Sequence, residues 1–208
     1  MHSSRPAPRP EPTLSYELHG NLYLNITWHC TLRCAFCPKF NGEWDVQGYD
    51  LRLRREPAVE ELLAAIGDPA PYKEIVFCGL GEPTLRLNVL LAVARAMKQA
   101  GKRVRVNTDG LANLVHGRDV TPAMAEVVDA VSISLNAHDE ATYVRHTRPK
   151  RPGAYAAMLD FAARARDAGM DVTLSAIDGL EGVDIPACER IARDLGVKFR
   201  RRVLDAVG

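Results

Sequence analysis

The fold of this chain is constrained most by an alternation of short strand patterns with longer amphipathic helical patterns, repeated six times. Because a helix between two strands forms a crossover, this order predicts an α/β fold with a parallel sheet and the helices outside it. Eight such units need about 250 residues, so 208 residues predict a partial (β/α)6 TIM-like barrel. Strands are expected within 16–27 and at 74–78, 103–108, 130–136, 171–177 and 197–204, and helices at 57–67, 139–146, 153–168 and 184–195 and after 87 and 121.

The predicted strands alternate polar with apolar residues, whereas a strand buried on both faces should be apolar throughout. The apolar faces must meet the helices, which leaves the polar faces to line the inside of the barrel. Because each buried polar group without a partner costs about 1–3 kcal/mol, we interpret the interior as a wet cavity for a polar ligand. An antiparallel sheet with one solvated face would give the same alternation. The inward-facing residues are Arg105, Asn107, Ser132, Ser134, Asn136, Thr173, Ser175, Lys198, Arg200 and Arg202.

Three of the five cysteines, Cys30, Cys34 and Cys37, follow the first predicted strand within eight residues. Thiolates are soft ligands that suit zinc or iron–sulfur clusters. A zinc site usually takes four protein ligands, and no fourth cysteine lies nearby. Three thiolates on a four-iron cluster leave one iron open to another ligand. A zinc site or a disulfide is the alternative interpretation.

The Cys30-x3-Cys34-x2-Cys37 pattern, with Phe36 before the last cysteine, resembles the cluster motif of the radical SAM superfamily. This resemblance implies a [4Fe-4S] cluster whose open iron is chelated by S-adenosylmethionine. It also implies that an electron from the cluster cleaves the sulfonium to a 5′-deoxyadenosyl radical, which abstracts a hydrogen atom from the substrate. Phe36 is expected to contact the cofactor.

A second motif, Gly79-Leu80-Gly81-Glu82-Pro83, follows the second predicted strand. It resembles the Gly-Gly-Glu-Pro segment of the same superfamily, whose backbone binds the amino group of S-adenosylmethionine. The resemblance therefore makes Gly79, Gly81, Glu82 and Pro83 cofactor-binding candidates, with Glu82 acting through its backbone more than its carboxylate. The sequence departs from the commoner pattern at Leu80, and a strand-to-helix turn alone would also favour glycine and proline.

Further candidates lie at the ends of the third, fourth and fifth strands. Asn107-Thr108-Asp109-Gly110 resembles the family's Asn-Thr-Asn-Gly, with Asp109 in place of the second asparagine. Ser134 and Asn136 resemble positions that hold the ribose and carboxylate of the cofactor, and Ile177 matches an apolar position against adenine. Asn136 could equally cap the following helix, and Ile177 is also an ordinary core residue.

The runs 19–27, 77–86 and 131–137 look most like the TatD-associated radical SAM proteins. That subgroup implies a compact core, expected over 14–208, with no auxiliary cluster domain and no known substrate. Residues 1–13, rich in proline and arginine and without an apolar segment, are expected to form a disordered extension rather than a secretory signal. Clustered free cysteines without a signal predict a reducing cytoplasm.

The formal net charge of +1 gives no general attraction to nucleic acid, and no apolar run approaches a membrane span. We expect a small-molecule or peptide substrate and an electron donor such as flavodoxin or ferredoxin. Alternation points Arg200 and Arg202 inward, where they could clamp a carboxylate or phosphate of the substrate. Two other functions stay open: an activase that makes a glycyl radical on a protein partner, and a non-catalytic iron–sulfur electron-transfer module.

Overall fold

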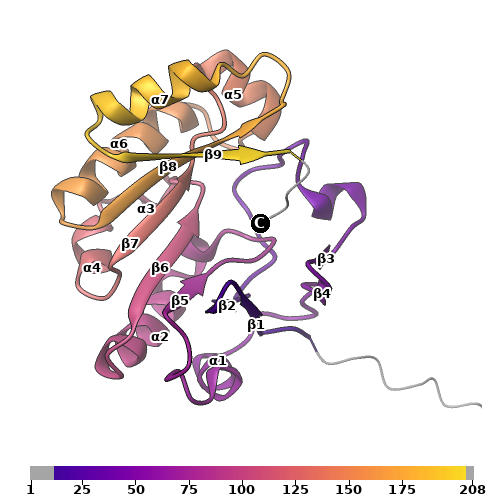
Figure 1. The fold of residues 1–208 in the computed structure, drawn as a ribbon, viewed down its shortest axis with the longest axis vertical. Coiled ribbons are helices and arrows are strands. Elements are labelled where there is room, and N and C mark those ends of the chain that lie inside the picture. Colours follow the sequence, from indigo (N-terminus) through magenta and orange to yellow (C-terminus); the bar gives the residue numbers. More distant parts are fainter. Residues whose placement is uncertain (1–11, 205–208) are drawn as a thin grey trace, which may run out of the picture.

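The computed structural model describes residues 12–204, which form a curved sheet of seven strands with helices along its outer face (Figure 1). Six of these strands, β2, β5, β6, β7, β8 and β9, pair in parallel, which confirms the predicted α/β partial barrel. In spatial order the strands are β1 (Ser15–Leu18), β2 (Asn21–Leu24), β5 (Glu74–Phe77), β6 (Arg103–Thr108), β7 (Ala130–Ser134), β8 (Asp171–Asp178) and β9 (Lys198–Val203).

The first strand region differs from the prediction because it contains two antiparallel strands, β1 and β2, instead of one. His19 and Gly20 turn the chain between them with φ values of 54° and 75°. Such left-handed turns match the twist of a hairpin, although histidine rarely marks them. β1 and β9 are therefore the two edges of the sheet, and the barrel is open between them.

Helices follow the strands as crossovers and cover the outer face of the sheet (Figure 1). Side-chain caps start two of them: Asp139 accepts from the Thr142 amide, and Asp184 accepts from the Ala187 amide. The five-residue helix α3 was not predicted, because it is too short to show a helical period. The helices are α1 (Val59–Ile66), α2 (Leu87–Gln99), α3 (Ala112–His116), α4 (Thr121–Ala125), α5 (Glu140–Thr147), α6 (Ala154–Asp167) and α7 (Ile185–Asp194).

The excursion of the chain between β2 and α1 has little regular structure. It contains the 3-10 turn η1 (Pro38–Asn41) and a small hairpin of β3 (Asp45–Val46) and β4 (Tyr49–Asp50). Figure 1 shows this hairpin on the open side of the barrel, away from the helices. A second 3-10 turn, η2 (Pro83–Arg86), precedes α2.

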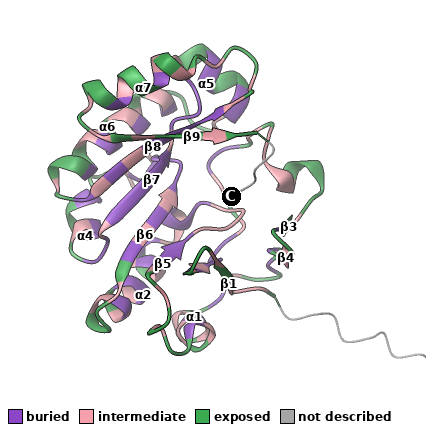
Figure 2. Cartoon of the chain, in the orientation of Figure 1, coloured by how far each residue is buried: buried purple, intermediate pink, exposed green. Residues whose placement is uncertain are grey.

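The core lies between the helices and the apolar faces of the central strands (Figure 2). Val104, Val106 and Ile133 are fully buried there, together with Met158 and Phe161 of α6. Burial of a side chain of this size contributes about 1.5–3 kcal/mol, so this layer fixes which strand face turns outward. The polar residues that alternate with these must then face the inside of the barrel.

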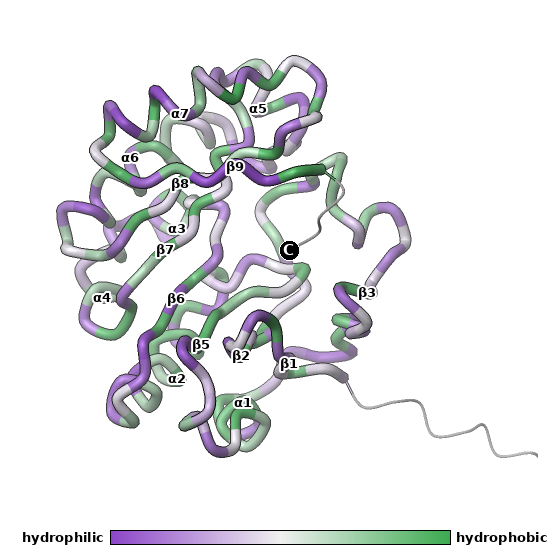
Figure 3. Tube along the Cα trace, viewed as in Figure 1, coloured by the Kyte–Doolittle hydropathy of each residue, from purple (hydrophilic) through white to green (hydrophobic). Residues whose placement is uncertain are grey.

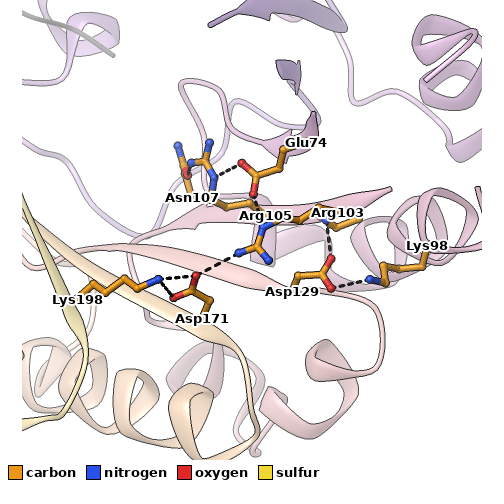
Figure 4. A network of polar contacts seen from close by, with 9 residues as sticks. Glu74, Lys98, Arg103, Arg105, Asn107, Asp129, Asp171 and Lys198 are labelled. Atoms are coloured by element: carbon orange, nitrogen blue, oxygen red, sulfur yellow. Dashed lines mark hydrogen bonds and ion pairs between the residues drawn. The ribbon is translucent and has the colours of Figure 1, made fainter. Parts of the chain in front are cut away.

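An ion-pair network joins the starts of the parallel strands (Figure 4). The Nε atom of Arg105 lies 2.7 Å from Glu74 Oε2, and Arg103 contacts both Glu74 and Asp171 at 3.2 Å. Lys198 Nζ at the start of β9 lies 2.8 Å from Asp171. This network lies at the amino-terminal ends of the strands, opposite the ends that carry the predicted site residues.

The predicted N-terminal extension lies outside the described residues except for Pro12 and Thr13. The Asn25 side chain donates to the Thr13 carbonyl over 3.0 Å, so the chain already contacts the body of the protein at this point. Across residues 12–204, no helix is both long enough and apolar enough to cross a membrane.

Candidate functional site

A cavity of about 280 Å³ lies inside the barrel toward the carboxyl ends of the strands. Its wall includes the polar strand residues Asn107, Ser132, Ser134 and Ser175, as the alternation predicted. Nearly all other predicted site residues also line it: Cys30, Cys34, Phe36, Cys37, Gly79, Gly81, Glu82, Asn136, Ile177, Arg200 and Arg202. Pro83 is buried at the start of η2 and is not part of the cavity wall, so its predicted role is not supported by its position.

The loop that carries the three cysteines is fixed by main-chain hydrogen bonds. The amides of Arg33 and Ala35 donate to the carbonyls of Thr147 and His146 at the end of α5, over 2.9 and 2.8 Å. On the other side, Lys39 donates to the carbonyls of Trp28 and Leu80 over 2.8 and 2.7 Å. The cysteine loop therefore rests against both α5 and the loop after β5.

The three thiols are free and half-buried, and they share one wall of the cavity. Burial, followed by the nearby charges of Asp109 and Glu82, raises the pKa of Cys30. Burial and the two neighbouring thiols raise the pKa of Cys34. A metal centre bound by Cys30 and Cys34 would have to displace their protons, because metal ligation requires the thiolate.

The donor set fits an iron–sulfur cluster. Within residues 12–204, no three His, Cys, Asp or Glu side chains are grouped so that they could hold one metal ion. A zinc ion needs four donors that converge on it, whereas each thiolate of a cluster binds its own iron. Three separate thiols on one cavity wall thus suit a cluster with one iron left open.

The segment after β5 passes very close to the cysteine loop. A Cβ atom on Gly81 would lie 2.2 Å from the Thr27 carbonyl oxygen and 2.8 Å from that of His29, so only glycine fits there. The Glu82 amide donates to the His29 carbonyl over 2.7 Å. The two motifs found in the sequence are therefore joined directly through their backbones.

The Glu82 carboxylate is buried and fully used inside the protein. It accepts hydrogen bonds from the amide and hydroxyl of Thr84, from the Thr108 hydroxyl and from the Asp109 amide, over 2.7–3.0 Å. Four donors leave little capacity for a ligand. The expectation that Glu82 would act through its backbone agrees with this geometry.

Asp109 holds the cysteine loop in place through a hydrogen bond that the sequence did not predict. Its carboxyl group is buried and accepts from the Thr31 hydroxyl, next to the first cysteine, and from the Leu111 amide. Burial and the adjacent Glu82 raise the pKa of Asp109 well above its ordinary value. The sequence signal was the Asn107-Thr108-Asp109-Gly110 motif, which does not reveal a partner 78 residues away.

Two predicted cofactor residues have side chains held by arginines. Arg105 Nη1 donates to Asn107 Oδ1 over 2.6 Å, and Arg202 Nη2 donates to Asn136 Oδ1 over 2.7 Å. Asn136 has a φ of 57° and does not cap α5, whose cap is Asp139. The capping interpretation of Asn136 is therefore wrong.

Further residues of the cavity wall were not predicted. Cys78, directly after β5, is half-buried and lines the cavity. The edge strand β1 and the β3–β4 region also contribute to the wall, through Tyr16, Leu18, Val46 and Leu51. No motif marked these positions, because they meet the cavity only through the hairpin and the long excursion.

Comparison with known proteins gives a family match over most of the chain. A model of the Radical SAM superfamily matches residues 24–195. Among curated proteins, GTP 3',8-cyclase of Corynebacterium glutamicum (strain R) is 28% identical over 188 residues, which is 86% of this chain and 48% of that protein. The chain thus spans about half the length of this curated relative.

Solved structures with this fold include Streptococcus suis SuiB bound to S-adenosylmethionine, with 15% identity, a TM-score of 0.63, and coverage of 89% of this chain and 38% of that chain. SuiB bound to precursor peptide SuiA has 14% identity, a TM-score of 0.63, and coverage of 86% and 38%. The methyltransferase TsrM from Kitasatospora setae, with cobalamin and a [4Fe-4S] cluster bound, has 11% identity, a TM-score of 0.57, and coverage of 84% and 35%. At these identities the likeness concerns the fold.

Proposed function

The chain belongs to the radical SAM superfamily, and from this premise we propose that it is an enzyme that cleaves S-adenosylmethionine at a [4Fe-4S] cluster and takes a hydrogen atom from a substrate. The observation that carries the proposal is that Cys30, Cys34 and Cys37 line the same cavity as the glycine-rich segment after β5. A non-catalytic electron-transfer module would not need a polar cavity of about 280 Å³ beside its cluster.

In this proposal the three cysteines hold the cluster, and the contacts of their loop with α5 and with the loop after β5 fix its position. When bound, the cluster supplies one electron that breaks the C5′–S bond of S-adenosylmethionine, and the resulting 5′-deoxyadenosyl radical removes a hydrogen atom from the substrate. The buried thiols must lose their protons as the cluster binds. Asp109 and Glu82 support the cluster site indirectly. Asp109 accepts a hydrogen bond from Thr31 of the cysteine loop, and Glu82 accepts one from the Asp109 amide.

We assign S-adenosylmethionine to the cavity wall next to the cysteines. Gly79 and Gly81 let the segment after β5 pack against Asn25 and the cysteine loop, which keeps its backbone at the cavity wall, and Glu82 secures that backbone. Ser134 and Asn136 offer polar groups at the end of β7, and Asn107 does so at the end of β6. Phe36 and Ile177 supply apolar contact surface, and Pro83 contributes by starting η2.

Within the superfamily we place the chain with the TatD-associated radical SAM proteins, on the strength of the motifs around 19–27, 77–86 and 131–137. The substrate is proposed to be a small molecule or a peptide, and the electron donor a flavodoxin or ferredoxin. The free cysteines support a reducing cytoplasm as the location. An activase for a protein partner is the alternative within the same chemistry.

The test is to reconstitute the protein anaerobically, reduce it with dithionite, add S-adenosylmethionine and measure 5′-deoxyadenosine. We expect product from the wild type and none from Cys34→Ala, which should also lose the iron content of the cluster. Cys188→Ala is the matched control, because this buried cysteine of α7 is not part of the cavity wall. Production of 5′-deoxyadenosine by Cys34→Ala at the wild-type rate would remove the basis of the assignment.

A further inference from the structure

Two arginines of β9 face the cavity without a carboxylate to neutralise them. Arg200 and Arg202 both line its wall. Among residues 12–204, no hydrogen bond or ion pair is made by the Arg200 guanidinium. Arg201, between them on the strand, forms an ion pair with Asp178 and is not part of the cavity wall. Arg201 is therefore paired with a carboxylate, whereas Arg200, which is exposed at the rim, and Arg202, which is partly buried, are not.

The Arg202 guanidinium makes one hydrogen bond that fixes its position, and one of its buried donors has no acceptor among the described residues. Its Nη2 atom donates to Asn136 Oδ1 over 2.7 Å, which fixes the guanidinium against the end of β7. Its Nε atom is buried and has no acceptor in the part of the chain that the structure describes. Burial first, and the charge of Arg200 second, lower the pKa of Arg202 to about 10. A buried donor without an acceptor is unfavourable, so this position is suited to an acceptor supplied by a ligand.

The other charged groups of the wall are already satisfied by the protein. The carboxylate of Glu82 accepts four hydrogen bonds, and Asp109 accepts from Thr31 and Leu111. Arg105 is neutralised by Glu74 at 2.7 Å. The β9 side of the cavity thus carries two positive charges for which the described residues supply no counter-charge.

The pair lies on the strand at the opposite edge of the sheet from the cysteine loop, although Arg202 adjoins two residues that we assign to the cofactor. Arg202 donates to Asn136 and lies beside Ile177 in the sheet register, while Arg200 lies beside Ser175, one pleat nearer the amino-terminal ends of the strands. The cysteine loop and the glycine-rich segment follow β2 and β5, toward the other edge of the sheet. β9 is an edge strand with mostly hydrophilic residues (Figure 3), and it borders the open side through which a ligand can enter.

We propose that Arg200 and Arg202 bind an oxyanion group of the substrate, a carboxylate or a phosphate, and so make this an enzyme for anionic substrates. The inference rests on the proposed function, because it takes the cavity to hold cofactor and substrate together. The Cα atoms of residues two apart on one strand face lie about 7 Å apart, so two long arginine side chains on that face can reach the same oxyanion group. Guanidinium forks bind such groups through paired, charge-assisted hydrogen bonds.

The test is calorimetric titration of the metal-free protein, and of the cluster-loaded protein with S-adenosylmethionine, with inorganic phosphate, pyrophosphate and glutarate. We expect at least one of these probes to bind the wild type, and to bind Arg202→Gln at least tenfold more weakly. Arg201→Gln is the matched control and should bind like the wild type. Arg202→Lys keeps the charge but loses the fork, so it should be intermediate, and melting of each variant checks its folding.

Binding of the phosphates alone identifies a phosphate group, and binding of glutarate alone identifies a carboxylate; either result supports the proposal. Equal binding by Arg202→Gln and the wild type, or no binding of any probe to the wild type, would overturn it. Loss of S-adenosylmethionine binding in Arg200→Gln would also overturn it, because the pair would then serve the cofactor. If the wild type formed no cluster, the proposed function would fail, while the metal-free titration would still report on the arginines.

Discussion

The contact between Gly81 and the cysteine loop allows a quantitative prediction for Gly81→Ala. The added Cβ would lie 2.2 Å from the Thr27 carbonyl oxygen, where ordinary contact begins near 3.4 Å, so the backbones must separate by about 1 Å. That displacement removes the 2.7 Å hydrogen bond from the Glu82 amide to His29. Overpacking costs about 1–3 kcal/mol and a buried amide without a partner about 1–3 kcal/mol. We expect the free energy of unfolding to fall by about 2–6 kcal/mol.

The measurement is urea unfolding of the metal-free protein, followed by iron analysis after reconstitution. Gly117→Ala is the control, because Gly117 has a φ of 63° and nothing lies within 4 Å of its Cβ position. It should lose only the roughly 1–2 kcal/mol of a left-handed alanine and should take up a full cluster. Equal destabilisation of the two variants, or a full cluster in a stable Gly81→Ala, would refute the close approach.

Two further substitutions test the polar contacts of the fold. The Arg86 side chain is 16% exposed and donates to two main-chain carbonyls over 3.0 and 2.7 Å, so Arg86→Ala should lower the free energy of unfolding in urea by about 2–4 kcal/mol. The Arg95 side chain is 53% exposed and lies 3.8 Å from Glu126, so Arg95→Ala should change the free energy of unfolding by less than about 0.5 kcal/mol. Comparable losses would contradict this contrast. The hydrogen bond from Lys198 is the main cause of the lowered pKa of Asp171. Because this pKa is lower in the folded state than in the unfolded state, the ionised carboxylate stabilises the fold above about pH 4, and this stabilisation is lost as the pH falls through the folded-state pKa. Lys198→Gln should therefore be less stable by about 0.2–1 kcal/mol near pH 7, and this difference should disappear as the pH falls through the folded-state pKa of Asp171. A difference that did not shrink as the pH falls would refute the linkage.

The parallel barrel could be predicted because strand and helix periods alternate along the chain and leave only crossover connections. The polar interior followed from the same alternation, as Asn107, Ser134 and Arg202 illustrate. β1 was missed because its turn uses His19 in a left-handed conformation, which residue preferences disfavour. Local sequence patterns thus predict which face of a strand is buried, but they do not reveal a turn formed by residues that rarely form one.

The position of the cysteine loop depends on contacts that could not be predicted from the sequence. The motif predicted which residues gather at the cavity, and the structure brings them there. The anchors of the loop were not visible, because Thr31 and Asp109 are 78 residues apart and Glu82 reaches Thr108 across two strands. Such contacts depend on the packing of β5 beside β6, which no local pattern records.

The main-chain contacts between the cysteine loop and α5 link the three cysteines to a distant part of the chain. Arg33 and Ala35 donate to the carbonyls of Thr147 and His146 at the end of α5. A substitution that shifts the end of α5 should therefore move the cysteines through the backbone, although it removes no thiol. Loss of iron from such a variant would report a displaced loop and not a lost ligand.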